Sequence, residues 1–369
     1  MRLMFVYWQP DDAGSAQTIV NYTEAARALG HEVVLYGPED EASRFRCSLD
    51  VESADAVVFL LEWNLYLPPG DLKAEGRRRT RDGLMGIGHF NLVQLLSKVP
   101  RARRVVIDDD GMYNDMIHVG GDYNHLDAEA SRRRIELYDS LADKIYQPTP
   151  HPLRPNVGTF FFHAYDPAWE RPLDFRAKAY GMVYVGNNWF RWRAMQQVLR
   201  AIEPIRDEVG RIGLVGRDWG AMPFWVESPL REAAYYTDPD YLNRLGVEIM
   251  PPVPVDQVVD RMSQGVFNPV LVRPVFNHLR LVNPRLFETP AANTIPLFCL
   301  DRPYVQEIYG AQAGELVLAA DPAAASEQIV DVLRRPDEYA DIVRGIRRHL
   351  AAHHSYEVRL RELIGIVTT

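Results

Sequence analysis

Short apolar segments alternate with helical stretches along the whole chain, and this alternation constrains the fold more than any other feature. The first unit runs from an apolar segment at 3–8, through a loop that contains Gly14, into an amphipathic stretch at 16–29 and a second apolar segment at 32–36. Apolar runs of this length predict buried strands, and apolar residues at helical spacing predict the helix between them. Strands that alternate with helices form a parallel, doubly wound sheet. We therefore predict an α/β protein.

The alternation continues in two separate series, which predicts two domains in a chain of 369 residues. Further strands are expected at 56–61, 104–107 and 144–147 in the first series, and at 181–185, 211–215, 247–250, 270–271, 295–300 and 316–319 in the second. A stretch rich in proline and aromatic residues, 148–172, separates the two series and is typical of a domain connection. We expect a Rossmann-like N-terminal domain at 1–165, a Rossmann-like C-terminal domain at 166–352 and a closing helix within 353–369, with the two domains facing each other across a cleft.

The charge of the chain restricts its partners. The net charge is −9, and broad nucleic-acid binding needs a basic surface, so such binding is not expected. Runs of arginine at 77–81, 101–104 and 132–134 are expected to be solvated helix faces and loop ends. A patch for an anionic acceptor, or a peripheral contact with a membrane surface, is the alternative interpretation.

Cysteine use and hydropathy indicate a cytoplasmic protein. The two cysteines, Cys47 and Cys299, are too far apart for a zinc motif and too few for a disulfide framework. Cys299 follows an apolar run and is expected to be a buried, inert thiol. The apolar run at 3–8 is too short for a signal peptide, and no stretch approaches the ~18 apolar residues of a membrane span.

Ligands of open α/β sheets bind beyond the carboxyl ends of the strands, so the loops that follow the strands are the candidate sites. Gly14 lies in the first of these loops, where a glycine lets backbone N–H groups approach an anion at a helix start. The loop lacks the further glycines of a dinucleotide-binding motif, which disfavours a nicotinamide cofactor. An ordinary capped loop is the alternative.

Three acids, at 108–110, follow the fourth strand-like run, and carboxylates this close repel one another unless a partner compensates. A carboxylate here could accept the proton of a hydroxyl acceptor. We therefore take Asp109 and Asp110 as catalytic candidates, together with His118. His89 and His125 could belong to the same wall. The alternative is a helix cap followed by a turn.

Basic residues follow two strands of the second series. Gly186, Asn187, Arg191 and Arg193 lie at the start of a helix, where arginine's forked donors suit a phosphate. Arg217 follows the next strand and could reach the same phosphate. Trp219, two residues later, could stack on a nucleobase. For each arginine a surface ion pair is the alternative.

The segment RLFETPAANTIPL, at 285–297, predicts a short helix, a turn and a buried strand. Glu288 lies near the helix start, where a carboxylate can accept two ribose hydroxyls. Arg285 and the helix N-terminus can hold a diphosphate, and Phe287 completes the predicted donor-binding set. Asn293 is expected to take the left-handed conformation at the turn.

These motifs together resemble the GT-B glycosyltransferases, in particular the family-four-like and CgeB-like groups. The carrying residues are the opening strand, glycine loop, helix and GHEV strand, then YVGNNWFRWRAMQQVLRAI, RLFETPAANTIPL and a closing H-x-Y…R pattern. In that resemblance Gly186 matches the family's glycine and Glu288 its ribose-binding glutamate. His354, Tyr356 and Arg359 match the closing helix, which in such enzymes returns to the N-terminal domain.

Three departures from the family pattern bear on the donor site. Arg280 stands eight residues before Glu288, where the family has a second glutamate, so the donor sugar is left open. Asn187 stands where an arginine is common, and Arg193 where a lysine is common. Gly14 alone represents the usual pair of glycines in the first loop.

The resemblance implies an enzyme, a glycosyltransferase of the hexosyltransferase type. It implies a nucleotide diphosphate sugar as co-substrate, most readily a UDP-sugar, and a small-molecule or glycan acceptor with a hydroxyl group. No obligatory metal or other cofactor and a retaining outcome are also implied. A GT-B-fold sugar-nucleotide epimerase and a non-catalytic nucleotide-sugar-binding protein are the alternatives.

Overall fold

The computed structural model describes residues 1–7, 14–37, 44–61, 95–224, 226 and 229–369. The chain forms two compact units. The first unit comprises Met1–Ile117, Asn124–His163 and Tyr356–Thr369, and the second comprises His118–Tyr123 and Ala164–Ser355. These divisions lie close to the expected boundaries at 165 and 352. The sequence did not indicate that His118–Tyr123 would belong to the second unit.

The first unit is built on a seven-stranded sheet in the order β3-β2-β1-β4-β5-β8-β9, in which every neighbouring pair is parallel. The strands are β1 (Arg2–Val6), β2 (Glu32–Tyr36), β3 (Cys47–Ser48), β4 (Ala56–Leu61), β5 (Arg104–Asp108), β8 (Lys144–Gln147) and β9 (Val157–Thr159). All six side chains of β4 are buried. A continuous apolar strand of this kind is covered on both faces, as a parallel sheet requires.

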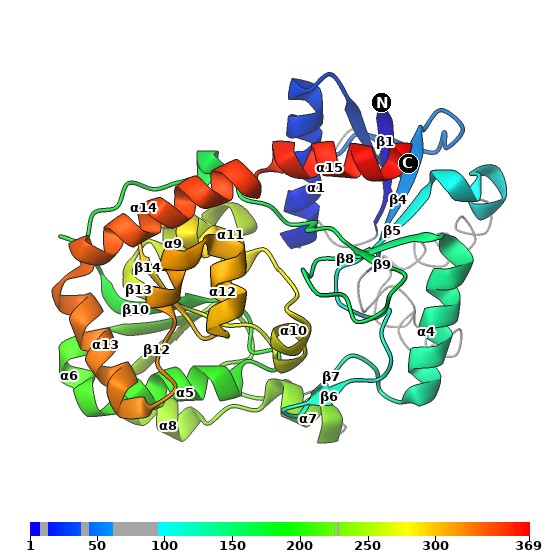
Figure 1. Ribbon diagram of the computed structural model, residues 1–369. Coiled ribbons are helices and arrows are strands. Elements are labelled where there is room, and N and C mark those ends of the chain that lie inside the picture. The colour runs from blue at the N-terminus through cyan, green and yellow to red at the C-terminus, as the bar shows by residue number, and fades with distance from the viewer. Residues whose placement is uncertain (8–13, 38–43, 62–94, 225, 227–228) are drawn as a thin grey trace. The chain divides into compact units, whose positions relative to one another are not determined.

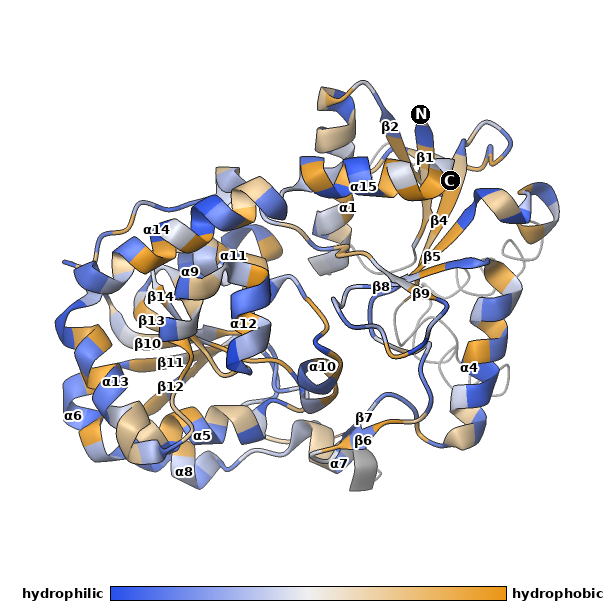
Figure 2. Ribbon diagram, viewed as in Figure 1, coloured by the Kyte–Doolittle hydropathy of each residue, from blue (hydrophilic) through white to orange (hydrophobic). Residues whose placement is uncertain are grey.

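Helices complete the first unit (Figure 1). They are α1 (Gly14–Ala28), η1 (Arg101–Arg103), α4 (Ala128–Leu141) and α15 (Tyr356–Thr368). Asp127 caps α4, because its side chain accepts a hydrogen bond from the amide of Ala130. The C-terminal helix α15 packs against α1. Figure 2 shows apolar colour along β4 and mixed colour on α4, as expected for a core strand and a surface helix.

The second unit has a five-stranded parallel sheet in the order β12-β11-β10-β13-β14. Its strands are β10 (Tyr180–Val185), β11 (Ile212–Val215), β12 (Val247–Met250), β13 (Gly265–Val270) and β14 (Ile295–Phe298). A separate antiparallel hairpin is formed by β6 (His118–Val119) and β7 (Asp122–Tyr123). Parallel strands need crossover connections, and helices supply them here.

The helices of the second unit are η2 (Pro167–Trp169), α5 (Trp192–Ile202), η3 (Glu203–Ile205), α6 (Arg206–Val209), α7 (Pro229–Tyr235), α8 (Pro239–Arg244), η4 (Val255–Gln257), α9 (Val258–Met262), α10 (Pro274–Leu279), α11 (Arg285–Ala291), α12 (Arg302–Tyr309), η5 (Ala311–Leu316), α13 (Pro322–Arg334) and α14 (Pro336–His353). The strand expected at 316–319 was wrong. Only Val317 pairs there, in a single bridge with Phe298, because η5 occupies the preceding residues. Both sheets otherwise confirm the predicted α/β class.

Candidate functional site

Two glycines bring the loops after β10 and β11 into contact in the second unit. Gly216 has a φ of 151°, and a Cβ atom on it would lie 2.3 Å from the carbonyl oxygen of Gly186. The amide of Gly186 donates to the carbonyl of Val215 at 2.8 Å. The amide of Arg217 donates to Oδ1 of Asn187 at 2.9 Å. The two predicted phosphate loops therefore form one rigid structure at the carboxyl edge of the sheet.

This packing corrects the role expected for Trp219. The side chain is 0% exposed, and its indole N–H donates to the Gly186 carbonyl at 2.7 Å. Its ring meets the Tyr184 ring edge-on, with 5.6 Å between the centroids. A ring enclosed in this way cannot stack on a nucleobase. Trp219 instead stabilises the loop after β10 through its hydrogen bond to Gly186. Asn187 likewise supports the loop through its side-chain carbonyl.

Arg191 and Arg193, at the start of α5, differ from most surface arginines of the chain. Arg334, for example, pairs with Glu208 at 2.7 Å. Among the residues that the structure describes, neither Arg191 nor Arg193 has a carboxylate partner. Arg191 donates from Nη1 to the Asn187 carbonyl at 2.9 Å, while its buried Nε has no hydrogen-bond partner. Both positive charges are thus left without compensation.

Further buried polar atoms near Arg191 lack partners. The Tyr184 hydroxyl and the side-chain oxygen Oδ1 of Asn188 are buried, and neither atom has a hydrogen-bond partner. Burial raises the pKa of Tyr184, and the positive charges of Arg191 and Arg285 act against that rise. Since almost all buried polar groups in proteins are hydrogen-bonded, this cluster at the end of β10 is an exception that requires an explanation.

Helix α11 carries the acidic residue predicted to bind ribose. Glu288 is 4% exposed, and its Oε2 pairs with Nη1 of Arg285 one turn earlier. No described residue donates to Oε1 of Glu288. Phe287 is fully buried, with its ring 6.0 Å from that of His354. The Phe287 ring therefore belongs to the core, and the place of this residue among the donor-binding residues stays a prediction.

The turn after α11 also differs from the expectation. Asn293 is not among the described residues with positive φ. Its side chain instead pairs with the backbone of Asp174, with both hydrogen bonds at 2.9 Å. The left-handed residue is Arg280, with φ 52° and ψ 42° at the end of α10. Arg280 lies 3.6 Å from Glu307, so it supplies a paired cation where the family has a glutamate.

The acids after β5 have different roles in the first unit. Asp108 accepts hydrogen bonds from the amides of Met112 and Tyr113 and from the side chains of Tyr138 and Gln147, which makes it a structural residue. Burial raises its pKa. Asp110 is half-buried. The structural role of Asp108 leaves Asp109 and Asp110 as the candidates for chemistry.

Asp109 is 8% exposed and lies beside a histidine that the sequence analysis did not single out. Its Oδ2 lies 2.9 Å from Nε2 of His163, and its Oδ1 has no hydrogen-bond partner. Nδ1 of His163 lies 2.8 Å from the hydroxyl of Thr18, on α1. That hydroxyl also donates to the carbonyl of Gly14 at 3.3 Å. A buried carboxylate is thus held by one oxygen, with the other oxygen unengaged.

The other histidines proposed for the site, His118 and His125, have different environments. His118 is exposed and belongs to the second unit, whereas Asp109 and Asp110 belong to the first. His125 is buried, with Nε2 2.9 Å from the Met112 carbonyl, and burial lowers its pKa. His125 is therefore structural, whereas the role predicted for His118 stays a prediction. His89 lies outside the described residues.

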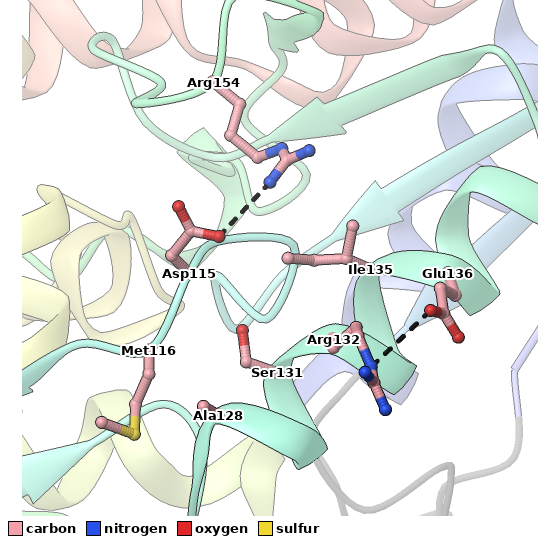
Figure 3. Close-up of a pocket in the computed structure, with 8 residues that line it drawn as sticks. All are labelled: Asp115, Met116, Ala128, Ser131, Arg132, Ile135, Glu136 and Arg154. Atoms are coloured by element: carbon pink, nitrogen blue, oxygen red, sulfur yellow. Dashed lines mark ion pairs between the residues drawn. The ribbon is translucent and has the colours of Figure 1, made fainter.

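A cavity of about 330 Å³ lies in the first unit beside α4 (Figure 3). It is lined by Asp115, Met116, Ala128, Ser131, Arg132, Ile135, Glu136 and Arg154. Arg154 is directed toward Asp115 at 3.7 Å, and Arg132 faces Glu136 at 3.8 Å. These charges compensate one another, and no predicted catalytic residue lines the cavity. The cavity is thus separate from the candidate site.

The described ranges contain neither a metal-binding cluster nor a helix suited to span a membrane. No group of three or more His, Cys, Asp or Glu side chains in those ranges is arranged to hold a metal ion. No helix there combines the length and the hydropathy needed to cross a membrane. Cys299 is partly buried, and burial raises the pKa of its thiol to about 12. A thiol with this pKa is unreactive, as expected.

Comparison with known proteins places the geometry in a wider context. Residues 193–365, a little under half of the chain, match a family model described as Glycosyl transferase-like. No curated protein matches the sequence. An α-glucosyltransferase solved with UDP and a mismatch-containing 13-mer DNA is similar, with a TM-score of 0.61 at 14% identity over 100% of this chain and 99% of that chain.

Two β-glucosyltransferase structures are also similar over 100% of both chains. One, described as a DNA modifying enzyme, has a TM-score of 0.58 at 10% identity. T4 phage BGT in complex with UDP and Mn2+ has a TM-score of 0.56 at 12% identity. Identities this low show a shared fold alone. The predicted GT-B fold is thereby confirmed, and the family match agrees with the prediction of a glycosyltransferase.

Proposed function

We propose that this chain is a glycosyltransferase that transfers a hexosyl group from a UDP-sugar to a hydroxyl acceptor. The cluster at the end of β10 carries the proposal. There the buried Nε of Arg191 and the buried hydroxyl of Tyr184 lack partners, and Arg193 is uncompensated. A diphosphate supplies negative charge and acceptor oxygens that fit such donors. Positive side chains also stabilise the departing diphosphate as the sugar leaves it.

Glu288 would hold the ribose of the donor. Arg285 neutralises its Oε2, so Oε1 remains to accept a ribose hydroxyl. The same ion pair offsets part of the cost of burying the carboxylate. Gly186 and Gly216 let the two loops of the proposed diphosphate site pack closely against each other. Arg217 and Gly14 complete the set of proposed donor residues.

Similar structures favour uridine as the base. An α-glucosyltransferase and T4 phage BGT of the same fold were solved with UDP. Binding of UDP, GDP and dTDP to the full chain by calorimetric titration tests this choice, with uridine alone as the comparison. Glu288→Ala should abolish UDP binding, whereas Glu288→Gln should retain part of it through the amide oxygen. Unchanged affinity in Glu288→Ala would remove Glu288 from the donor site.

Asp109 would receive the proton of the acceptor hydroxyl. Its free Oδ1 is the atom positioned for this transfer, and His163 holds the other oxygen. Asp109→Asn should therefore remove transfer while UDP binding persists. His163→Gln should lower kcat, with the donor KM unchanged. If Asp109→Asn transfers sugar at the wild-type rate, the base lies elsewhere, with Asp110 and His118 as the next candidates.

Stereochemistry provides a second test of the mechanism. The family resemblance implies retention at the anomeric carbon. A base that deprotonates the acceptor for direct displacement implies inversion instead, and Asp109 favours that outcome. Proton NMR of the product formed from an α-linked UDP-sugar distinguishes them. An α-linked product would exclude a single displacement and would remove the general-base role from Asp109.

A small molecule or a glycan is the proposed acceptor. Similar structures include an enzyme described as DNA modifying. In this chain, however, two of the arginines of α4 are compensated, since Arg132 and Arg133 both pair with Glu129. Labelled UDP-glucose should therefore be offered to duplex DNA and to glycans in parallel. Transfer to DNA would overturn this acceptor class.

The same incubation separates the alternatives. Sugar isomerisation without an acceptor would indicate an epimerase, and donor binding without turnover would indicate a non-catalytic binding protein. Arg191 and Arg193 would neutralise the diphosphate in place of a cation, so we propose that no metal is obligatory. Activity should persist in EDTA. Loss in EDTA with recovery in Mn2+, the ion present with T4 phage BGT, would contradict this.

A further inference from the structure

The β6–β7 hairpin, His118–Tyr123, is a structural part of the second unit although the chain on both sides of it belongs to the first. The hairpin packs against α10 (Figure 1). The sequence had grouped His118 with Asp109 on the acceptor side. The hairpin contributes residues to the unit in which Arg193 and Glu288 lie.

A buried ion pair anchors the hairpin. Asp122 is 0% exposed and accepts hydrogen bonds from Nε of Arg273 at 2.9 Å and from the amide of Val275 at 2.8 Å. Nη2 of Arg273 donates to the Tyr123 carbonyl at 2.8 Å. The Arg273 guanidinium also lies over the ring of Phe190, 5.1 Å from its centroid. Removing two charges from water is costly, so a pair of this kind is better explained by fixing a position than by stability alone.

The tip of the hairpin lies against a predicted phosphate-binding residue. Gly120 and Gly121 both have positive φ, 60° and 85°, which forms a tight turn that suits glycine. A Cβ atom on Gly120 would lie 3.3 Å from Cβ of Pro274 and 3.5 Å from Nη1 of Arg193. A Cβ atom on Gly121 would meet no atom within 4 Å. A side chain at Gly120 would therefore reach Arg193, whereas one at Gly121 would meet open space.

We propose that the hairpin is a wall of the diphosphate site, in which the Asp122–Arg273 pair holds Gly120 against Arg193 and so directs the Arg193 guanidinium at the phosphates of the donor. The proposal rests on the donor site described under the proposed function. No described residue forms a hydrogen bond or an ion pair with Arg193, so neighbouring backbone is what can limit its orientation. A long side chain held in one orientation loses less conformational freedom when it binds, which strengthens binding. Gly120 is then a positioning residue that acts through Arg193.

The two glycines provide a matched pair of variants. Asparagine adopts positive φ more readily than other residues with a side chain, so Gly120→Asn and Gly121→Asn should both fold. Calorimetric titration with UDP and with uridine measures the phosphate contribution. Gly120→Asn should weaken UDP binding about ten-fold relative to Gly121→Asn, the size expected for one disturbed charge-assisted hydrogen bond. Uridine affinity should be equal in both variants.

A double-mutant cycle tests whether Gly120 acts through Arg193. In an Arg193→Ala background, Gly120→Asn should have no further effect on UDP binding. Equal UDP affinities of Gly120→Asn and Gly121→Asn, or an effect that persists without Arg193, would overturn the proposal. The proposed function fails differently, by absence of UDP binding to the wild type or by full binding in Glu288→Ala. Absence of UDP binding overturns both.

Discussion

Substitution of Gly216 by alanine tests the donor loop most directly. The new Cβ would lie 2.3 Å from the Gly186 carbonyl oxygen and 2.6 Å from its carbon, whereas real Cβ atoms essentially never approach within 3.0 Å. The two loops must separate by at least about 0.7 Å, and overpacking of this kind costs about 1–3 kcal/mol. The φ of 151° adds a similar strain for any residue with a side chain.

Together these effects destabilise the second unit by about 4 kcal/mol, which lowers the unfolding temperature of a domain of this size by roughly 10 °C. Displacement of the loop should also weaken UDP binding by about ten- to a hundred-fold, because sub-ångström errors in a binding geometry are costly. Scanning calorimetry with and without UDP, combined with titration, measures both effects.

Gly37→Ala is the matched control for this experiment. Gly37 lies in the first unit, its φ is not positive, and a Cβ on it would meet no atom within 4 Å. This variant should leave both UDP affinity and the transition of the second unit unchanged. The reasoning is refuted if Gly216→Ala unfolds at the wild-type temperature and binds UDP with wild-type affinity, since the contact with Gly186 would then be absent in solution.

Three further changes test other parts of the structure. The guanidinium of Arg347 donates to the carbonyls of Pro290, Ala292 and two other residues. Arg347→Leu should therefore destabilise the second unit by about 3 kcal/mol, as measured by calorimetry. A loss of stability under about 1 kcal/mol would contradict this. Gly365→Ala in α15 should stabilise the first unit by about 0.5–1 kcal/mol, because a Cβ at this position would meet no atom within 4 Å and alanine favours a helix. A lower unfolding temperature of the variant would contradict this prediction. Burial lowers the pKa of Lys178 to about 8, so the folded protein releases this proton before the unfolded chain does, and stability should rise between about pH 8 and pH 10.5. Lys178→Met should remove that rise in urea titrations; the same rise in both proteins would contradict it.

The two sheets could be predicted because each strand is an apolar run that can be recognised from its own few residues. Every side chain of β4 and of β10 is buried, so neither strand depends on alternation for recognition. The strand predicted at 316–319 does not form. Val317 makes a single bridge with Phe298 after η5, rather than one step in a ladder of paired residues. Local composition does not distinguish a full strand from an isolated bridge, since the pairing partner decides which of the two forms.

Site residues divide in the same way. Gly186 and Glu288 could be proposed because each lies in a motif that is contiguous in sequence. His163 could not, because its partner Asp109 is 54 residues away and its own neighbours are the aromatic residues of a predicted connection. The burial of Trp219 was equally invisible, since it depends on the Gly186 carbonyl from another loop. Contacts between distant segments are what sequence patterns leave out.

Arginine shows most clearly what the structure adds to the argument for a donor site. From sequence, Arg132, Arg193 and Arg217 are equivalent cations beside helices or strands. Arg132 has Glu129 and Glu136 as partners, so a bound anion would have to displace a carboxylate. Arg193 has none among the described residues, and Arg191, two positions earlier on the chain, has a buried Nε without a hydrogen-bond partner. A diphosphate would therefore bind at Arg193 without breaking an existing ion pair, whereas an anion at Arg132 would compete with Glu129 and Glu136.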